Sequence, residues 1–510
     1  MRFFIQYLLW SLSFISILFF YFLNSSLGQS HLGFLIEDFL SKKTYNEIKV
    51  HSLNLEHYPS VVMDLTINHE AKVFLTGEVN NYSVDMDYHL FGDSFSFNSI
   101  KLEEKVDLTG HLKGPFSALK VQGEGEVFDG NVHYSFTKIP KKIIDMNLSM
   151  QHVKSQKVLK FLNKPLVIQG KANVTSFVKI FSKYEKRGKA KIYMAEASLP
   201  TLAKNISFSL NTELEFDDIA YKYNGKVNSK IGTLTIKNGE YHQTKQIAQA
   251  NYRFHLNDLN DVKEFLKKRY YGSLDTEGRV EYDGTFKVEG ITKKFGGILS
   301  YLYKNENVDF TLKNLSLSAL LEQFSYPVLL TAKVYGTANY NLKDKIVLMN
   351  TKLKEARFKE TKMTHMIQST LGINMLRDVY DESSFSAGYQ NHILSSILKI
   401  DSGVEHLFLT ETKMNAKSNK IDSKFEMKMQ GQELAGKLYG SLKDPQVSLD
   451  MSRLIKYQMN RQIGSFFGMT NGENVKKKLK SRSKEFEDKL DNLEINDVTQ
   501  KAKSLMNGFF

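Results

Sequence analysis

Apolar and polar side chains alternate with a period of two over most of this chain, from about Tyr45 to Asp450. A period of two sends successive side chains to opposite faces of a β-strand, and antiparallel sheets bury one such face while wetting the other. The alternation therefore predicts a long run of two-faced strands. The apolar positions that most clearly share one face are Ile206, Phe208, Leu210, Leu214 and Phe216; Val308, Phe310 and Leu312; and Phe425, Met427 and Met429.

Short turn signals separate these strands. Asn-Gly and Asp-Gly pairs supply the positive φ that tight hairpins require. We therefore expect a mainly β chain, folded as an elongated and curved antiparallel meander with a few short helices. The turn signals are Asn80-Asn81, Asp129-Gly130, Asn224-Gly225, Asn238-Gly239 and Asp283-Gly284.

One helix–strand unit recurs along the chain. In each copy a short amphipathic helix, expected at 158–163, 262–267 and 317–324, precedes a strand with a glycine near its middle. A glycine inside a strand usually marks a bulge or a bend, which would curve the sheet into a trough. The alternative is a chance likeness among common helix–strand junctions. The central glycines are Gly170, Gly278 and Gly336.

The apolar face of so long a sheet needs a cover, because soluble monomers rarely expose more than a few hundred Å² of contiguous apolar surface. The predicted helices are too few and too short to supply it. An open apolar groove that holds acyl chains satisfies this requirement. A closed sandwich or a series of barrels satisfies it equally well, and the pattern alone does not separate the two.

The chain begins with an uncharged apolar run, Phe3 to Leu23, which matches the roughly 20 residues that a membrane-spanning helix needs. Arg2 precedes the run and the next basic residue is Lys42, which predicts a cytoplasmic N-terminus and an exported body. A signal peptide cleaved near Ser26-Leu27-Gly28 is the alternative. The run is longer than a usual signal-peptide core, which favours an uncleaved anchor over residues 1–24 and a periplasmic body over 25–450.

Composition narrows the chemistry. The chain has no cysteine, which excludes disulfides and thiolate metal sites, and its net charge of +13 suggests either nucleic acid or an anionic membrane surface as a partner. The strongest lysine run, Lys476–Lys480, lies in one C-terminal segment, while the body mixes both signs. We therefore expect a membrane and no nucleic acid. Residues 451–510 read as basic amphipathic helices that either lie on a membrane or pack on the end of the sheet.

Catalytic signatures are weak throughout. The 13 histidines are scattered without zinc-site spacing. Gly123–Glu126 resembles a phosphate loop but precedes a strand and a turn, whereas a phosphate cradle needs a helix N-terminus. The carboxylate pairs Asp85/Asp87 and Asp217/Asp218 are typical of a solvated strand face. We expect no enzyme, no catalytic residue, no metal and no cofactor.

The segment Gly431–Gly464, GQELAGKLYGSLKDPQVSLDMSRLIKYQMNRQIG, resembles the C-terminal signature of AsmA-like proteins. The likeness extends back to about Ala387, so that residues 387–450 form an AsmA-like region, and it includes Ile400–Gly403. The N-terminal anchor and the ending Lys501–Phe510 fit the same family. AsmA- and TamB-like proteins are anchored in the inner membrane of diderm bacteria and carry an extended periplasmic β-groove. The N-terminal half departs from the better-known members.

The resemblance implies a lipid-transfer function with no active site. In this interpretation the groove shields phospholipid acyl chains and supports their transport to the outer membrane, with the apolar strand positions given above as its lining. The expected partners are phospholipids, the inner membrane, and an outer-membrane or other envelope protein. The alternative function is outer-membrane protein assembly, in which exposed strand edges pair with a client's strands.

Overall fold

A computed structural model describes residues 21–22, 25–55, 57–97, 100–200, 203–263, 270–323, 328–361, 364–365, 368–369, 372–441 and 444–450. Strands make up 65% of it, so the prediction of a mainly β chain is confirmed. Twenty-six strands form an antiparallel sheet that is not closed. The chain divides into two units, residues 1–254 and 255–510, which are described separately.

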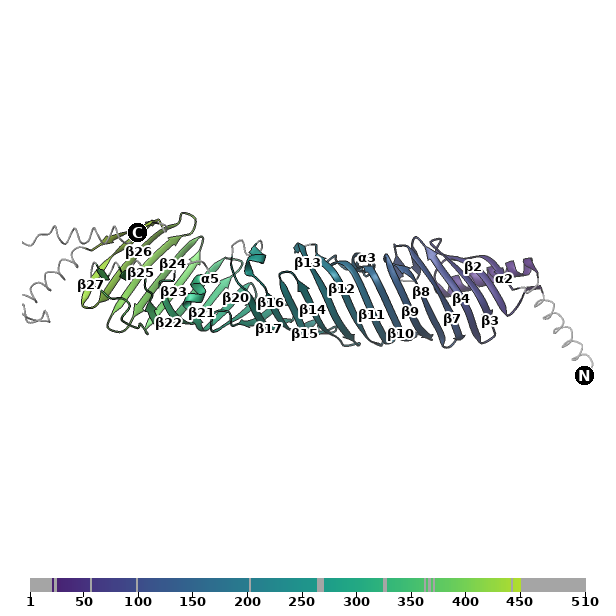
Figure 1. Ribbon diagram of the computed structural model, residues 1–510. Helices are drawn as coiled ribbons and strands as arrows, with labels where there is room; N and C mark the ends of the chain where they lie inside the picture. Colours follow the sequence, from purple (N-terminus) through teal and green to yellow (C-terminus); the bar gives the residue numbers. More distant parts are fainter. Residues whose placement is uncertain are drawn as a thin grey trace, which may run out of the picture. The chain divides into compact units, whose positions relative to one another are not determined.

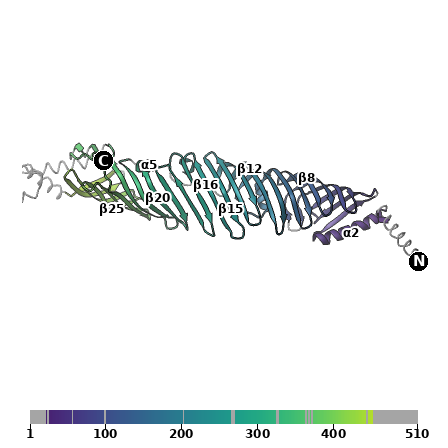
Figure 2. The ribbon, with the colours of Figure 1, turned by 90° about the horizontal axis from the view of Figure 1, so that it is seen from below.

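Unit 1 is a meander in which each strand pairs with the next one along the chain, apart from a small β5–β6 hairpin between β4 and β7 (Figure 1). The helix α2 lies beside the first strands (Figure 2). The elements are α2 Ser26–Thr44, β1 Ile48–Asn54, β2 Ser60–Ile67, β3 Ala71–Val79, β4 Ser83–Gly92, β5 Phe95–Phe97, β6 Ile100–Leu102, β7 Val106–Pro115, β8 Leu119–Val127, β9 Gly130–Ile139, β10 Lys142–Lys154, α3 Ser155–Phe161, β11 Gln169–Ser182, β12 Lys186–Leu199, β13 Ala203–Phe216, β14 Ala220–Ser229, β15 Gly232–His242 and β16 Ile247–Leu256.

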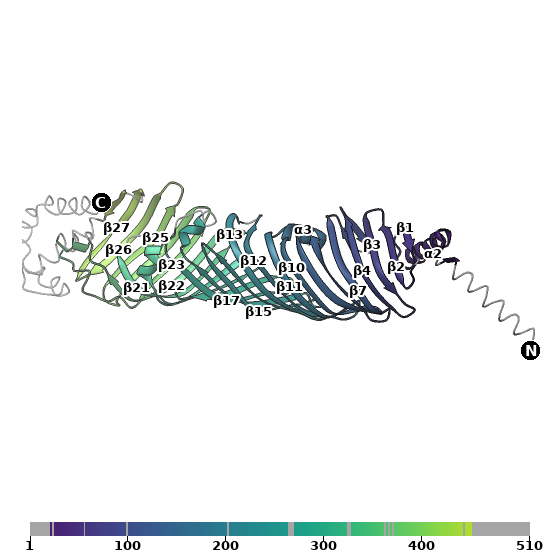
Figure 3. The same cartoon turned by 45° about the vertical axis from the view of Figure 1, so that its right-hand side comes forward.

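Unit 2 continues the same antiparallel pattern from β17 to β28 (Figure 3). Its helix α5 packs on β20 and β21. The elements are η1 Leu259–Val262, β17 Leu274–Tyr282, β18 Phe286–Thr292, β19 Ile298–Lys304, β20 Asn307–Ser316, α5 Leu317–Gln323, β21 Leu330–Asn341, β22 Ile346–Phe358, β23 Ser383–Gln390, β24 Ile393–Asp401, β25 His406–Asn415, β26 Lys420–Met429, β27 Gln432–Ser441 and β28 Asp444–Leu449.

All irregular insertions within a unit leave from the same end of its strands. Because successive strands reverse direction, the β5–β6 hairpin and α3 both follow strands that run the same way, namely β4 and β10. In unit 2, α5 and the segment 359–382 likewise follow β20 and β22. We call this end of the strands the insertion rim and the opposite end, where tight turns prevail, the turn rim.

Three of the bulges fall close to the insertion rim. The register shifts between Met150 and Val153 in β10, between Met194 and Ala197 in β12, and between Leu312 and Leu315 in β20. An extra residue on one strand bends that strand and increases its twist. The bulges therefore bend the strand ends where buried residues concentrate, as at Val153, 1% exposed, and Leu315, 0% exposed.

Two of the predicted turns are wrong. Asn224-Gly225 lies inside β14 and Asn238-Gly239 inside β15, where they face each other across a register shift. The Asn238 backbone N–H donates to Asn224 Oδ1 over 2.9 Å, and Asn238 has φ 52°. The positive φ that Asn-Gly provides is used here for a bulge between neighbouring strands. Asn80-Asn81, Asp129-Gly130 and Asp283-Gly284 do lie at turns, as predicted.

The predicted helix–strand units are present at α3–β11 and α5–β21. Of the helix expected at 262–267, only Val262, the last residue of the 3₁₀ turn η1, and Lys263 are described, so this prediction lies mostly outside the described part. At the central glycines Gly278 and Gly336, the backbone of the neighbouring strand approaches too closely for a side chain, and this accounts for glycine there better than a bulge does. A Cβ at Gly278 would lie 1.8 Å from the Glu289 carbonyl oxygen, and one at Gly336 would lie 2.1 Å from that of Asn350.

No helix among the described residues is long and apolar enough to cross a membrane. The predicted anchor Phe3–Leu23 lies outside them except for Tyr21 and Phe22, and the predicted C-terminal helices of 451–510 lie outside them entirely.

Replacing Gly336 by Ala should destabilise unit 2. Its φ of 153° is rarely adopted by L residues, and the new methyl group would meet a neighbouring carbonyl. We expect a loss of roughly 1–3 kcal/mol in the free energy of unfolding, measured by urea titration of the full chain. Gly388→Ala is the matched control, because its Cβ would meet nothing closer than the Leu348 side chain at 3.6 Å. Equal stability of both variants would contradict this account.

Candidate functional site

The sheet has two chemically distinct faces. On β8, Val121 and Val127 are half-buried, while Lys120, Glu124 and Glu126 on the other face are exposed. Antiparallel pairing carries this division from strand to strand, because residues opposite each other point to the same face. The same alternation recurs on β3, β14 and β17. We call the two sides the apolar face and the polar face.

The register places Phe208 and the predicted lining residues after it on the apolar face of their own unit. The alternating burial of Ile206, Ser207 and Phe208 puts Ile206 on the same face. In unit 1 Leu210 pairs with Met194 and Leu214 with Ala190, and in unit 2 Phe310 pairs with Tyr301 and Phe425 with Leu409. Those that remain half-buried are Ile206, Leu210, Leu214, Phe216, Val308, Phe310 and Phe425. Those taken up by the packed core are Phe208, Leu312, Met427 and Met429.

The core residues lie under the insertion rim because the insertions cover the apolar face there. In unit 2 the segment 359–382 contributes Ile373, 0% exposed, and Tyr380, 0% exposed, to the cluster that contains Met429. Gln430 fixes this segment through two reciprocal bonds with Asn374: the Asn374 N–H donates to Gln430 Oε1 over 3.1 Å, and Gln430 Nε2 donates to the Asn374 carbonyl over 3.0 Å. These residues are thus part of a closed core.

In unit 1 the cover is α3, which contacts β10 and β11. Lys157 in its first turn donates to Glu104 over 2.6 Å and to Asp129 over 2.8 Å, which ties the helix to two neighbouring loops. Lys154 donates to the other oxygen of Asp129 over 2.7 Å. The bonds from Lys154 and Lys157 lower the pKa of Asp129 from 3.8 to about 2.

Away from this rim, aromatic rings lie across glycines on the apolar face. Phe216 lies opposite Gly188, Tyr223 opposite Gly239 and Phe425 opposite Gly436, and in each pair a Cβ on the glycine would clash with the ring. Because glycine has no side chain, the ring can lie flat on the neighbouring strand. At these pairs an aromatic ring covers the backbone of the neighbouring strand.

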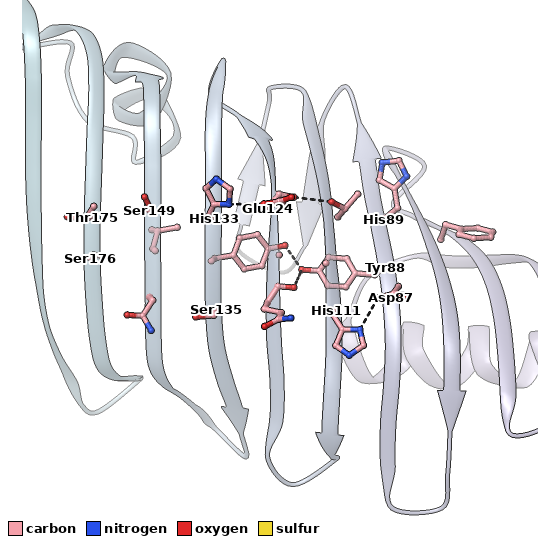
Figure 4. A pocket seen from close by; sticks show the side chains of 18 of the residues that line it. Asp87, Tyr88, His89, His111, Glu124, His133, Ser135, Ser149, Thr175 and Ser176 are labelled. Carbon is pink, nitrogen blue, oxygen red and sulfur yellow. Dashed lines mark hydrogen bonds and ion pairs between the residues drawn. The ribbon is translucent and has the colours of Figure 1, made fainter.

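Two tyrosines form the widest of these arrangements. The register row Tyr88–Gly110–Gly123–Tyr134 spans four strands, and the two hydroxyls meet across the glycines in a hydrogen bond (Figure 4). Burial raises the pKa of Tyr88, and its bond to Tyr134 raises it further. One hydroxyl donates to the other, and the Tyr88 hydroxyl can also donate to the Gln122 carbonyl at 3.4 Å. The two tyrosines are 46 positions apart in the sequence, so no local pattern indicated the pair.

The polar face of unit 1 carries a hollow of about 890 Å³ with a histidine on each of three strands (Figure 4). His89 contacts Asp107 at 2.9 Å and His133 contacts Glu124 at 2.9 Å. His111 contacts Asp85 at 2.9 Å through one ring nitrogen and Asp87 at 2.8 Å through the other. Since a neutral imidazole has a single N–H, both contacts are hydrogen bonds from the ring only when it is protonated.

The carboxylate pairs of the sequence have structural partners. Asp85 also accepts from Lys113 over 2.7 Å, which holds the pKa of Asp85 below its ordinary value. Asp217 accepts the backbone N–H groups of Ile219 and Ala220 at the β13–β14 turn, and Asp218 accepts that of Lys186 over 2.5 Å. Gly123–Glu126 lies within β8, as expected. Over the residues that the structure describes, no cluster of His, Asp and Glu could hold a metal ion.

Comparison of the chain with protein-family models, with curated proteins and with solved structures finds no match. The apolar face is the most extensive feature of the candidate site.

Replacing Lys157 by Met should loosen α3 at neutral pH, because the helix loses both carboxylate partners. The pKa of Asp129 is lower in the folded state, so its contribution to stability is present above about pH 4 and is lost as the pH falls through about 2. We expect the thermal midpoint of Lys157→Met to lie below that of the wild type at pH 7 and to approach it near pH 2.

Lys160→Met is the matched control for this prediction, since Lys160 is on the same helix but 62% exposed, at 3.3 Å from Glu103. It should behave like the wild type at both pH values. A Lys157→Met defect that is independent of pH would show that packing, and not the ion pairs, holds the helix.

Proposed function

We propose that this chain is a lipid-transfer protein whose apolar face forms an open groove for phospholipid acyl chains. The observation that carries the proposal is the half-buried state of the apolar face away from the insertion rim, where Leu214, Phe216 and Val308 have no covering layer among the described elements that pack on the sheet. A sheet face of this composition normally packs against protein. Acyl chains would complete the burial at about 0.8 kcal/mol per CH₂.

Such a surface needs no specific site. Acyl chains are uniform, and an apolar face of aliphatic groups and aromatic rings holds them by burial alone, while head groups remain in water. The aromatic–glycine pairs favour sliding over fixed binding, because at each pair the ring lies along the neighbouring strand. Because burial alone holds the acyl chains, the proposed function requires no catalytic residue.

The proposed cellular location and direction of transport rest on the sequence. Phe3–Leu23 would anchor the chain in the inner membrane of a diderm bacterium, with the body in the periplasm and transport directed toward the outer membrane. The AsmA-like segment 387–450, which folds into β24 to β28 and part of β23, supports this assignment by resemblance. Phospholipids and the inner membrane are the proposed partners, with an outer-membrane or envelope protein at the far end.

The alternative, assembly of outer-membrane proteins through open strand edges, is weakened at the first strand. The β1 backbone N–H of Val50 donates to Glu37 Oε2 over 3.0 Å, and that of Ile48 donates to Ser41 Oγ over 3.1 Å. Both acceptors are on α2. These donors are therefore not free to pair with a client strand.

A charge placed on the apolar face tests the conduit. Leu214→Lys would bring an unpaired ammonium into the path of acyl chains, at a cost of several kcal/mol if it is buried. We expect lipid transfer between donor and acceptor vesicles to fall more than about tenfold, and co-purifying phospholipid, measured by mass spectrometry, to fall with it.

The matched control is Asn211→Lys on the polar face of the same strand, which should transfer lipid like the wild type. Circular dichroism establishes that both variants keep the sheet. Normal transfer by a folded Leu214→Lys protein, together with defective outer-membrane protein assembly in cells, would replace the conduit by the assembly function.

A further inference from the structure

Only one side of the helix α2 packs on the sheet, against strand β1. Its Gly33 lies against Val50, where a Cβ would sit 3.5 Å from the valine side chain, and Glu37 and Ser41 bond the β1 backbone. Gln29 on the same side is buried. This side covers the edge of the first strand.

The other side of α2 exposes large apolar side chains. Leu27 is 68% exposed, Phe34 64%, Leu35 60% and Phe39 58%. The charges between them are partly neutralised: Lys42 pairs with Asp38 at 2.7 Å, and the Lys43 ammonium lies 5.1 Å from the centre of the Phe39 ring. Four exposed large apolar side chains on one helix are costly in water, and such a face normally has a partner.

The chain directly before α2 is fixed against it. The Ser25 N–H and hydroxyl both donate to the Tyr21 carbonyl, over 3.2 and 2.9 Å, and the Tyr21 hydroxyl contacts His31 Nδ1 at 3.0 Å. Gly28 makes this approach possible, because a Cβ there would clash with the same carbonyl. Tyr21 is the third residue from the end of the apolar run Phe3–Leu23, so the start of α2 is held at the end of that run.

We propose that the exposed side of α2 lies in the headgroup region of the membrane that Phe3–Leu23 enters, with Leu27, Phe34, Leu35 and Phe39 directed into the acyl boundary. The occupant is a lipid surface because only Asn24 and Ser25 separate the apolar run from the helix. A helix tied this closely to a membrane anchor cannot leave the interface. Lysines beside apolar groups suit that position, since their long stems lie along apolar surface while the ammonium stays in water.

A protein partner fits the surface less well. A stable protein interface buries about 800 Å² on each side, which is more than four side chains interrupted by charges present. The lipid surface also gives α2 a role in transfer. With one side on β1 and the other in the bilayer, the helix would seat the first strands of the sheet at the membrane, where acyl chains would reach the apolar face.

The inference rests on the proposed function, because it takes Phe3–Leu23 to be an anchor. The two are separable because the only tryptophan, Trp10, lies inside that run. The full chain is reconstituted in vesicles of phosphatidylethanolamine and phosphatidylglycerol that contain lipid brominated either near the headgroup or near the chain end. Quenching of Trp10 in the wild type by the deep bromines reports the anchor alone.

The position of the α2 surface is measured in the double variant Trp10→Phe, Phe34→Trp, whose single tryptophan lies on α2. We expect a blue-shifted emission and stronger quenching by the shallow bromines than by the deep ones. Phe116→Trp is the matched control, because Phe116 is 59% exposed and belongs to the turn between β7 and β8, not to α2. It should show emission typical of water and no quenching.

The outcomes separate the hypotheses. Deep quenching of Trp10 without quenching of Phe34→Trp would overturn the interfacial position and point to a protein or a second copy on α2. Equal quenching of Phe34→Trp and Phe116→Trp would also overturn it, since the whole sheet would then lie on the membrane. Loss of Trp10 quenching would instead remove the anchor and with it the proposed function.

A second variant links the position to transfer. The double substitution Phe34→Glu and Phe39→Glu should leave the protein anchored and folded but lower lipid transfer at least severalfold, whereas Phe116→Glu should not. Wild-type transfer by the double variant would contradict the seating role of α2.

Discussion

Antiparallel register is the constraint on which the structure depends. Each strand pairs with the next, and opposite residues share a face, so one apolar position fixes the side of its neighbours on every strand that follows. This is why Leu214, Ala190 and Ser176 fall on one face although they belong to three strands. A slip of one residue would exchange the two faces, and the long apolar face strongly opposes such a slip.

The meander has a second consequence at the strand ends. Because direction alternates, every insertion that follows a strand of one direction appears at the same rim, and α3, α5 and the segment 359–382 all do so within their units. Bulges bend the strands beside these insertions. One rim of the apolar face is thereby closed by protein, while the remainder is left for another apolar partner. The proposed lipid groove and the proposed seat of α2 on the membrane both address surface that the chain itself does not cover.

Much of the fold could be predicted from local pattern. The strands around Ile206–Phe216, Val308–Leu312 and Phe425–Met429, and the helix–strand junctions at α3 and α5, follow from periodicity alone. The Asn-Gly signals at Asn224 and Asn238 failed because positive φ serves a bulge as well as a hairpin, and only the neighbouring strand decides between them. The resemblance of residues 387–450 to AsmA-like proteins stays a prediction, and the fold is compatible with it.

For the candidate site, the sequence by itself determined which residues share the apolar face, because the period of two is a local property of the strand. Only the tertiary structure decided which of them remain accessible. Phe425 and Met429 lie on the same face of β26, two periods of the alternation apart. Tyr380 and Ile373 bury Met429, whereas Phe425 stays half-buried against Gly436. The hydroxyl pair of Tyr88 and Tyr134 and the helix edge that closes β1 also depend on residues far apart in the chain. Burial depends on such distant neighbours, and no local pattern contains them.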